Sequence, residues 1–391
     1  MAIEASNEAG RHGRIRLGMV GGGQGAFIGA VHRIAARIDD QFELVAAALA
    51  SDPIRAKASA KELGLADDRA YGSYEEMAKA EAARPDGIEA VAIVTPNHMH
   101  APVAKAFLHA GIHVICDKPL TTTVAEAEEL VALVRATGRV FVVTHNYTGY
   151  PMVRQARAMV AKGEIGDIRL VQAEYLQDWL TERLEATNHK QAAWRTDPAR
   201  SGAGGCIGDI GTHAYNLACF VSGLALDELL AELSTFVEGR RLDDDVQILL
   251  KWKGGAKGML WASQVAVGNE NALTLRVYGS KGGLEWAQEN PNQLWFTPHG
   301  QPKQLLTRGG AGAIGDAARV TRVPSGHPEG YLEGFATIYA EAARAIHAAR
   351  AGEKLGPDVL FPTVEDGLAG VKFIDAAVKS SAGKGLWVHI R

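Results

Sequence analysis

Short apolar runs alternate with helical patterns over the first third of the chain. The runs are apolar on both faces, which is typical of strands buried in a parallel sheet. Two of the helical patterns begin with the Ser/Thr-x-x-Glu spacing of a capping box, and the second ends at Gly138. This alternation predicts a doubly wound parallel sheet over about residues 14–147. The capping pairs are Ser73 with Glu76 and Thr123 with Glu126, and the strands are predicted at residues 15–20, 43–48, 90–94, 113–116 and 140–144.

A different pattern begins at about residue 168, where strands follow one another without helices between them. Glycine-rich turns such as 253–255 join several of these strands, which is typical of a largely antiparallel sheet. One helix is predicted inside the series, over about residues 212–221, and the segment of about 300–329 is predicted to be a loop. The strand patterns are IRLVQAEYLQ, LDELLAELSTFV, DDVQILLKW, KGMLWASQVAV, LTLRVYGSKGGLEW and QLWFTP.

Two amphipathic helices are predicted to close the chain. The first has an apolar stripe, and the second begins with Thr363 and Asp366 as capping residues. We therefore expect a doubly wound domain over residues 1–147 with a polar lead-in over 1–13, an α/β domain with a large, open, mostly antiparallel sheet over 148–330, and helices over 331–391 that pack back on both domains. The stripe consists of Tyr331, Phe335, Ile338, Ala342 and Ile346.

Composition limits the class of protein. The 391 residues suit two domains, and 47% hydrophobic with 22% charged residues is close to a globular average. The formal net charge of −4 gives no basic excess for nucleic acid, and no apolar run reaches the roughly 18 residues of a membrane span. The N-terminus lacks the apolar core of a signal peptide. Three cysteines without C-x-x-C spacing (Cys116, Cys206 and Cys219) fit a reducing compartment, so we expect a cytoplasmic protein.

The first strand is followed by the glycine-rich sequence GMVGGGQGAFIGAVH, which leads into a helix. Its spacing fits G-x-G-x-x-G/A, in which glycine permits a tight turn, close approach of a pyrophosphate and close helix packing. A phosphate would bind the N–H groups at the start of the helix. An ordinary glycine-rich turn is the alternative, but the position between a strand and a helix favours a dinucleotide site. The candidate residues are Gly21, Gly23, Gln24, Gly25 and Ala26, with Gly25 and Gly29 leaving the register open.

The end of the second strand should contact the adenosine ribose of such a cofactor. We align its tip with the neutral Ala50, where an NAD enzyme usually has an acidic residue. Ser51 and Arg55 could bind a 2′-phosphate, because a guanidinium matches phosphate geometry. Asp52 could instead accept from ribose hydroxyls if the register moves by two residues. The sequence favours NADP slightly over NAD.

The third strand ends in TPNHMH, so Thr95, Pro96 and Asn97 should lie at the carboxyl edge of the sheet, where such sheets bind ligands. His98 and His100 have the spacing of a metal-binding pair. No carboxylate or cysteine accompanies them, and we predict no metal site.

Two further stretches could carry chemistry. The fourth strand ends in CDKPL, and a lysine beside a proline is by itself more often a solvated loop charge than a functional group. A second stretch, GGCIGDIGTHAYN, places Asp209 and His213 four residues apart, on one face of a predicted helix that ends at Gly223. A histidine beside a carboxylate can act as a general base, although a capping Asp209 and a buried structural His213 would give the same pattern.

With these motifs the chain resembles the GFO/IDH/MocA oxidoreductases, named for glucose–fructose oxidoreductase and inositol dehydrogenase. The resemblance spans nearly the whole chain, and its motifs occur in the expected order. Asp117-Lys118-Pro119 matches the family motif E-K-P with Asp in place of Glu, and Asp209 and His213 match D-x-x-x-H. Asn216 stands where relatives commonly have a further Asp. The motif segments are GMVGGGQGAFIGAVH, VTPNHMHAPVA, CDKPL, HNYTGYP, WRTDPARSGAGG and GDIGTHAYN.

The resemblance implies a Rossmann domain, a second domain with an open sheet, and a nicotinamide between them. It implies hydride transfer between NAD or NADP and a secondary hydroxyl of a sugar, cyclitol or glycoside. His213 would deprotonate the hydroxyl, Lys118 would polarise its oxygen, and Asp209 would orient the polyol and support the histidine. His100, Asp117, Lys118 and Asn146 would join the cofactor residues named above. The substrate site would comprise Lys118, Tyr147, Tyr175, Asp178, Trp194, Arg195, Asp209 and His213.

Two other functions remain open on the sequence. One is an NAD-dependent glycoside hydrolase, which oxidises C3 transiently before elimination. The other is a non-catalytic regulator that binds NADP, and the intact Lys118, Asp209 and His213 disfavour it. The resemblance also implies a homodimer or homotetramer formed through the exposed sheet face of the second domain. Neither nucleic acid nor a membrane is expected as a partner.

Overall fold

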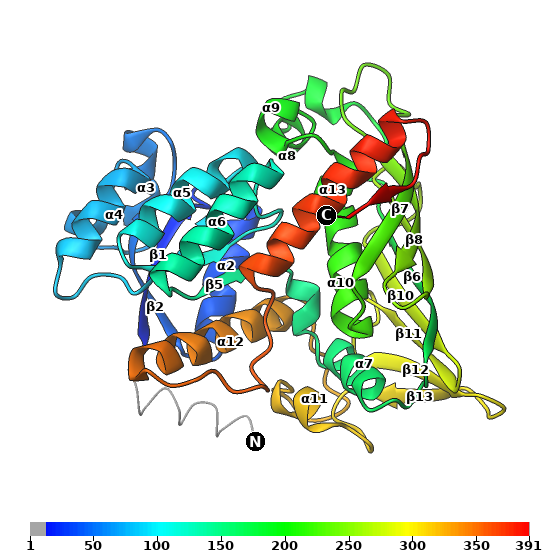
Figure 1. The fold of residues 1–391 in the computed structure, drawn as a ribbon. Helices are drawn as coiled ribbons and strands as arrows, with labels where there is room; N and C mark the ends of the chain where they lie inside the picture. Colours follow the sequence, from blue (N-terminus) through cyan, green and yellow to red (C-terminus); the bar gives the residue numbers. More distant parts are fainter. Residues whose placement is uncertain (1–12, 391) are drawn as a thin grey trace. The chain divides into compact units, whose positions relative to one another are not determined.

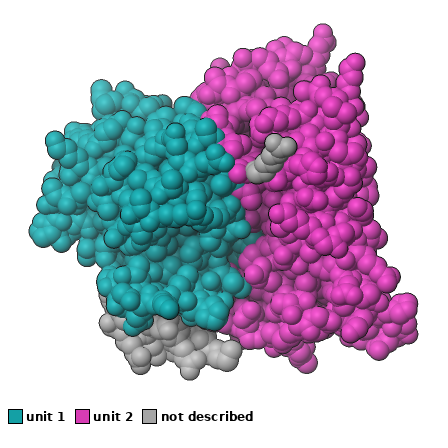
Figure 2. Space-filling model, viewed as in Figure 1, with its two compact units in different colours: residues 1–121, 125–149, 331–368 teal, residues 122–124, 150–330, 369–391 magenta. Residues whose placement is uncertain are grey.

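The computed structural model describes residues 13–390 and forms two compact units, which Figure 2 distinguishes by colour. Unit 1 runs to Thr121 and also contains residues 125–149 and 331–368. Unit 2 contains residues 122–124, 150–330 and those from 369 onward. Helix α13 (Val364–Ala382) consequently begins in unit 1 and ends in unit 2. The predicted lead-in lies, apart from Gly13, outside the described residues.

The described part of unit 1 contains a five-stranded parallel sheet in the order β2-β1-β3-β4-β5 (Figure 1). The chain reverses its direction of winding between β1 and β3, so the ends of these strands meet at the edge where such folds bind ligands. The predicted doubly wound sheet is confirmed, and its strands begin and end within two residues of the predicted positions. The strands are β1 (Ile15–Gly21), β2 (Phe42–Ala48), β3 (Ala90–Val94), β4 (His113–Cys116) and β5 (Phe141–Val143).

Helices flank this sheet and join its parallel strands. The last of them in sequence, α12 (Tyr331–Ala351), brings the predicted apolar stripe into the same core as β1 and α2. Phe335, Ile338 and Ile346 of this stripe are almost completely buried. The other helical elements are α2 (Phe27–Ile38), α3 (Pro53–Glu62), η1 (Asp67–Arg69), α4 (Tyr74–Ala83), η2 (Asn97–Met99), α5 (His100–His109), α6 (Val124–Thr137) and η3 (Asn146–Gly149).

The helix ends show how far the capping patterns predict contacts. Ser73 Oγ accepts from the Glu76 N–H at 3.2 Å, as expected at the start of α4. The Glu76 carboxylate, however, accepts from the N–H of Gly72. The start of α13 has the full reciprocal pair, because Thr363 Oγ1 accepts from the Asp366 N–H and Asp366 Oδ2 accepts from the Thr363 N–H.

The described part of unit 2 contains a nine-stranded sheet in the order β13-β12-β11-β10-β6-β9-β8-β7-β14. Only the β6–β9 pair in this described sheet is parallel, so the predicted mostly antiparallel sheet is confirmed. The strands are β6 (Ile168–Leu176), β7 (Leu226–Ser234), β8 (Asp245–Trp252), β9 (Lys257–Ser263), β10 (Ala272–Gly279), β11 (Gly282–Ala287), β12 (Gln293–Pro298), β13 (Gln304–Thr307) and β14 (Val388–His389).

Helices lie against one face of this sheet, as the green α7 and α10 show in Figure 1. Side chains on the opposite face of the central strands, among them Leu249, Met259 and Trp261, are exposed. None of the helices within residues 13–390 is long and apolar enough to span a bilayer. The helical elements are α7 (Pro151–Ala161), η4 (Leu184–Ala186), α8 (Lys190–Arg195), α9 (Pro198–Ser201), η5 (Ile207–Gly211), α10 (Thr212–Ser222) and α11 (Gly315–Arg319), together with most of α13.

The predicted loop at about 300–329 is irregular over most of its length, but the prediction missed β13 and α11 within it. Strand β13 pairs with β12, and α11 contacts α7. A buried ion pair between Arg308 and Glu329 organises the rest, because the guanidinium also donates to the carbonyls of Val323 and Pro324. This pairing joins residues 21 positions apart, and a charge count along the sequence does not reveal it.

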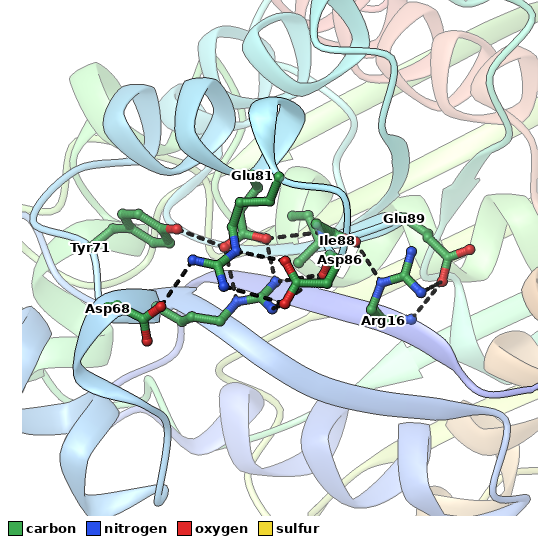
Figure 3. Close-up of polar contacts among 10 residues, drawn as sticks. Arg16, Asp68, Tyr71, Glu81, Asp86, Ile88 and Glu89 are labelled. Carbon is green, nitrogen blue, oxygen red and sulfur yellow. Dashed lines mark hydrogen bonds and ion pairs between the residues drawn. The ribbon is translucent and has the colours of Figure 1, made fainter.

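A buried carboxylate organises the outer part of unit 1 around α4. Glu81 accepts from Arg69 Nε at 3.1 Å, from the Tyr71 hydroxyl at 2.7 Å and from the Ile88 N–H at 3.0 Å (Figure 3). The Glu81 side chain is fully buried and that of Arg69 nearly so. Glu81 is therefore the buried counter-ion of Arg69, which also pairs with the exposed Asp86 at 3.4 Å.

Replacing Glu81 with alanine is expected to lower the free energy of unfolding by about 3–5 kcal/mol, because Arg69 loses its buried counter-ion. Chemical denaturation would measure the change. The matched control is Glu75→Ala on the exposed side of the same helix, which is expected to cost less than about 1 kcal/mol. Equal losses in the two variants would contradict the assignment of Glu81 as a structural anchor.

Candidate active site

The glycine-rich turn has the geometry that a cofactor phosphate requires. Strand β1 ends at Gly21, whose φ is +79°, and α2 begins at Phe27. A Cβ at Gly21 would lie 2.6 Å from the Val94 carbonyl oxygen, and one at Gly23 would lie 2.7 Å from that of Leu49. Both positions therefore exclude a side chain. The turn leaves the N-terminus of α2 facing the carboxyl edge of the sheet, which suits a phosphate.

The structure resolves the register of this turn. Ala26 is the N-cap residue of α2. Gly29 lies within the helix, where a Cβ would approach the Gly22 carbonyl oxygen to 2.3 Å. Gly29, rather than Ala26, is therefore the residue that lets the helix pack closely on the turn.

A cavity of about 380 Å³ lies beside the turn, between α2 and α3. Gln24 at its rim donates through Nε2 to Glu62, and its backbone N–H donates to Ser59 Oγ. Arg33 also lines the cavity and donates to the Gly22 carbonyl at 2.8 Å. Burial lowers the pKa of Arg33 from its ordinary value. Gln24 is thus tied to α3 as well as to the turn.

The segment after β2 is exposed from Ser51 to Arg55. Asp52 Oδ1 accepts from the Arg55 N–H at 2.8 Å and caps α3. This hydrogen bond fixes the position of the Asp52 carboxylate. The Arg55 side chain starts one turn into the helix and remains exposed to solvent.

His100 connects the ends of β3 and β4. Its ring is fully buried, with Nδ1 2.8 Å from the Pro119 carbonyl oxygen and Nε2 3.0 Å from that of Thr95. Burial lowers the pKa of His100, although the charge of Asp117 opposes this effect. The geometry is that of a structural link and not of a metal pair with His98. Within residues 13–390, no three His, Cys, Asp or Glu side chains gather as a metal site would require.

Lys118 is the second residue after β4 and is half-buried, and its peptide bond to Pro119 is cis. The preceding Asp117 turns into the protein, where its Oδ1 accepts from His32 Nε2 at 3.0 Å and from Thr144 Oγ1 at 2.6 Å. Burial alone would raise the pKa of Asp117, but the interaction with His32 and the hydrogen bonds bring it below its ordinary value. An ionised carboxylate therefore anchors the residue before Lys118.

The histidine in this anchor is itself held from α12. Tyr339 Oη lies 2.8 Å from His32 Nδ1. Burial raises the pKa of Tyr339 well above its usual range, so the phenol keeps its proton. Because the ionised Asp117 carboxylate can only accept, His32 Nε2 carries the hydrogen of this contact. A helix more than 200 positions later in the sequence thus supports the Lys118 turn.

The motif after β5 adds buried polar groups to the same edge of unit 1. His145, Asn146 and Tyr147 are all buried. Burial, followed by the nearby charge of Lys118, lowers the pKa of His145 to about 3, so this histidine stays neutral near pH 7. Thr95 Oγ1 and Asn146 Nδ2 are buried without a hydrogen-bond partner in the described residues. Unsatisfied polar atoms at the ligand-binding edge, together with the glycine turn, fit a dinucleotide.

In unit 2, the stretch with the paired Asp and His begins at a tightly held turn. Asp243 accepts from the N–H groups of Gly205 and Ile207, at 2.6 and 2.8 Å. Burial raises the pKa of Asp243 to about 6. A π-helical turn, Ile207–Gly211, then carries Asp209, and α10 begins at Thr212. The helix ends at Gly223 in the left-handed conformation predicted for the cap.

The Asp209 carboxylate is engaged from two sides. Its Oδ2 accepts from Arg195 Nε at 3.1 Å and from Gln264 Nε2 at 2.9 Å. His213 lies one turn later on α10 and is buried, with its ring 6.2 Å from that of Tyr175. Asn216 continues this line of residues. Its Oδ1 is buried without a hydrogen-bond partner in the described residues.

The remaining predicted substrate residues of unit 2 are held by neighbouring side chains and backbone groups. The Tyr175 hydroxyl donates to Asn271 Oδ1 at 2.7 Å. Asp178 accepts from the Gly268 N–H at 3.0 Å. Trp194 stacks with Arg195, whose guanidinium carbon lies 4.2 Å from its ring centre. The structure therefore groups Trp194, Arg195 and Asp209, whereas Asp178 belongs to a separate loop contact.

Comparison with known proteins identifies the family. A family model described as "Oxidoreductase family, NAD-binding Rossmann fold" matches residues 15–156, and one described as "GFO/IDH/MocA C-terminal domain" matches residues 153–285. The chain belongs to the GFO/IDH/MocA oxidoreductase family. The predicted resemblance is confirmed, and an NAD-binding Rossmann domain is shown.

Three relatives illustrate the range of this GFO/IDH/MocA group. A crystal structure of an oxidoreductase from Sinorhizobium meliloti is 59% identical, with a TM-score of 0.88 over 96% of this chain and 99% of that chain. An inositol dehydrogenase homolog from Azotobacter vinelandii, complexed with NADH and myo-inositol, is 38% identical, with a TM-score of 0.90 over 96% of this chain and 97% of that chain. A levoglucosan dehydrogenase from Pseudarthrobacter phenanthrenivorans is 30% identical over 72% of this chain and 75% of its own.

Several residues that organise the site in this GFO/IDH/MocA oxidoreductase were not predicted. His32 and Thr144 hold Asp117, and Gln264 and Asp243 hold the Asp209 turn. The motif GAFIGAVH contains His32, but nothing in the sequence pairs it with a residue 85 positions away. The three consecutive aspartates 243–245 were a detectable signal, because a buried strand rarely begins with three carboxylates unless they have partners.

Replacing Gly23 with alanine is expected to raise the Kd for NAD at least tenfold, because the added Cβ displaces the turn from the carbonyl of Leu49. Calorimetric titration of NAD would measure the change, with circular dichroism to check the fold. Gly315→Ala is the matched control, since a Cβ there meets open space. A folded Gly23→Ala variant that binds NAD normally would place the cofactor phosphates elsewhere.

Proposed function

We propose that this protein is an NAD-dependent dehydrogenase that oxidises a secondary hydroxyl of a cyclitol, sugar or related polyol. The observation that carries the proposal is the presence of all three catalytic residue types of the family, with defined contacts that hold Asp209 and the residue before Lys118. Asp117 anchors the Lys118 turn, and Arg195 with Gln264 fixes Asp209. The inositol dehydrogenase homolog and the levoglucosan dehydrogenase among the relatives support the substrate class.

The proposed roles follow from the chemistry of these groups. His213 accepts the hydroxyl proton, because a neutral imidazole is a base near pH 7. Lys118 donates a hydrogen bond to the same oxygen and stabilises the developing alkoxide. Asp209 accepts from polyol hydroxyls and orients the ring. The bound nicotinamide supplies the hydride acceptor, and Thr95, Asn146 and the glycine turn are the residues proposed to hold the dinucleotide.

Preference between NAD and NADP is a separate proposal. Ser51 and Arg55 are exposed and could bind a 2′-phosphate, as the sequence suggested. Asp52, however, places a carboxylate at the start of α3, and a negative charge there repels a 2′-phosphate. We therefore propose NAD as the preferred cofactor. Asp52→Ala should raise the relative efficiency with NADP, and Arg55→Ala should lower it.

A screen of cyclitols, sugars and glycosides with NAD and with NADP tests the function. Reduced cofactor forming with a polyol, together with an oxidised product of the same carbon skeleton, is the expected result. Release of an aglycone without net NADH would instead support the glycoside hydrolase alternative. Purified protein that binds NAD but transforms none of these compounds would overturn the proposed substrate class.

We also propose that the exposed sheet face of unit 2 joins copies of this chain into a homodimer or homotetramer. Leu249, Met259 and Trp261 place large apolar surfaces on adjacent strands of that face. Light scattering coupled to gel filtration would give the mass. A Met259→Glu variant that still forms the wild-type oligomer would exclude this face.

A further inference from the structure

The Asp209 carboxylate is bound by an ion pair that the D-x-x-x-H motif does not contain. Arg195 Nε and Gln264 Nε2 both donate to the same oxygen, Oδ2. Arg195 comes from the short helix α8, and Gln264 follows directly after β9. Two elements far apart in sequence thus meet at one oxygen of the proposed substrate-orienting carboxylate.

The guanidinium is held in place before it reaches Asp209. Its Nη1 donates to Gln191 Oε1 at 2.6 Å, and its plane lies over the Trp194 ring at 4.2 Å. Stacking of this kind orients a guanidinium without consuming its N–H donors. Gln264 is equally fixed, because its backbone N–H donates to the Asp244 carbonyl and its carbonyl accepts from the Leu180 N–H.

This arrangement restricts what Arg195 can do. A guanidinium that bonds Asp209, contacts Gln191 and stacks on Trp194 has much of its surface already committed. The charge pair is only partly buried, with 24% of the Arg195 side chain exposed. Its main effect is therefore on the carboxylate: the cation favours the ionised form, and two donors on one oxygen fix the rotation of the group.

We propose that Arg195 is a positioning residue, which keeps Asp209 ionised and correctly rotated for a polyol and for His213, and does not itself bind the substrate. The proposal rests on the proposed function for the role of Asp209. It changes the assignment made from the family motifs, in which Arg195 lines the substrate site directly. The charged and titratable groups around Asp209 in unit 2 are Arg195 from α8, His213 from α10 and the buried Cys206 that precedes the π-helical turn. The carboxylates 243–245 before and at the start of β8 also act on Cys206.

Chemical rescue tests this proposal. Arg195→Ala is expected to lower kcat about 10- to 100-fold. Guanidinium ion at millimolar concentrations is expected to raise the kcat of this variant at least fivefold, because the partly exposed position of Arg195 admits a small cation. The kcat of Arg195→Lys should be lower than that of Arg195→Ala rescued with guanidinium, since an ammonium cannot reproduce the planar donor. The control Arg200→Ala, on the exposed side of α9, should neither lose activity nor respond to guanidinium. A rise in KM alone, without rescue, would overturn positioning in favour of direct substrate binding.

A second readout needs no turnover. In protein labelled with ¹³C at aspartate carboxyls, the Asp209 signal, assigned with Asp209→Asn, should titrate at higher pH in Arg195→Ala than in wild type. Identical titration in the two proteins would overturn the proposal. Wild-type protein that is inactive on every polyol, yet shows this shift, would reject the proposed function and leave the Arg195–Asp209 coupling established.

Discussion

Replacing His213 with alanine is expected to lower kcat by about 10²–10⁴-fold, because this change removes the proposed general base for the substrate hydroxyl. The Kd for NAD is expected to change less than twofold, since the dinucleotide is assigned to unit 1 and His213 belongs to α10 of unit 2. Absorbance of the reduced cofactor would give kcat, and calorimetric titration would give the Kd.

The control for this variant is His299→Ala, an exposed histidine of the same unit, which should retain normal turnover. His145 does not substitute as the base, because its lowered pKa of about 3 makes it a poor proton acceptor near pH 7. Loss of NAD binding together with undiminished turnover would reject His213 as the catalytic base.

Replacing Lys118 with methionine is expected to lower kcat by about 10²–10³-fold, as the loss of one preorganised donor to an oxyanion does. Methionine keeps the apolar stem, so the change isolates the charge and its hydrogen bonds. The rate would be measured at saturating polyol and NAD. Turnover near the wild-type level would return Lys118 to the status of a solvated loop charge.

Lys79→Met is the matched control, on the exposed side of α4 in the same unit. A more selective comparison is Asp117→Asn, which leaves Lys118 in place but weakens the hydrogen bonds that His32 and Thr144 make to the preceding residue. If the anchor positions the lysine, this variant should lose kcat while NAD binding persists.

The sequence predicts the sheets well because their signal is local and repeated. Both-face apolar runs indicate buried parallel strands, and a change of spacing at about residue 168 marks the antiparallel sheet. The glycine turn is predictable for a similar reason, since steric exclusion at Gly21 and Gly23 leaves glycine as the residue that fits. In both cases, the strands and the glycine turn, the residue type is determined by the conformation and burial of a single local segment.

The contacts that place the proposed catalytic residues are different. Asp117 is held by His32, which lies 85 positions earlier, and Asp209 by Gln264, which lies 55 positions later. Neither pair has a spacing that a helix or a strand imposes. The motifs therefore identify which side chains are candidates, whereas their partners depend on the fold that brings distant elements together.

The departure of Asp117 from the family motif now has a physical account. The shorter side chain ends where it can accept from both His32 and Thr144, within 3.0 and 2.6 Å of its Oδ1. A glutamate would carry its carboxylate one methylene further from the backbone, so these two hydrogen bonds match the length of an aspartate. The sequence showed the substitution but could not show which groups surround it.

The dependence of unit 1 on α12 has a consequence for the order in which the protein can be made. The glycine turn and all five strands of the first sheet are translated by residue 143. Phe335, Ile338 and Ile346 of α12, which complete the core behind β1 and α2, are translated much later. Until that helix emerges, the nascent sheet presents an uncovered apolar face. Folding of the cofactor-binding half is therefore finished only after α12 has been translated, and until then this face can bind chaperones or aggregate.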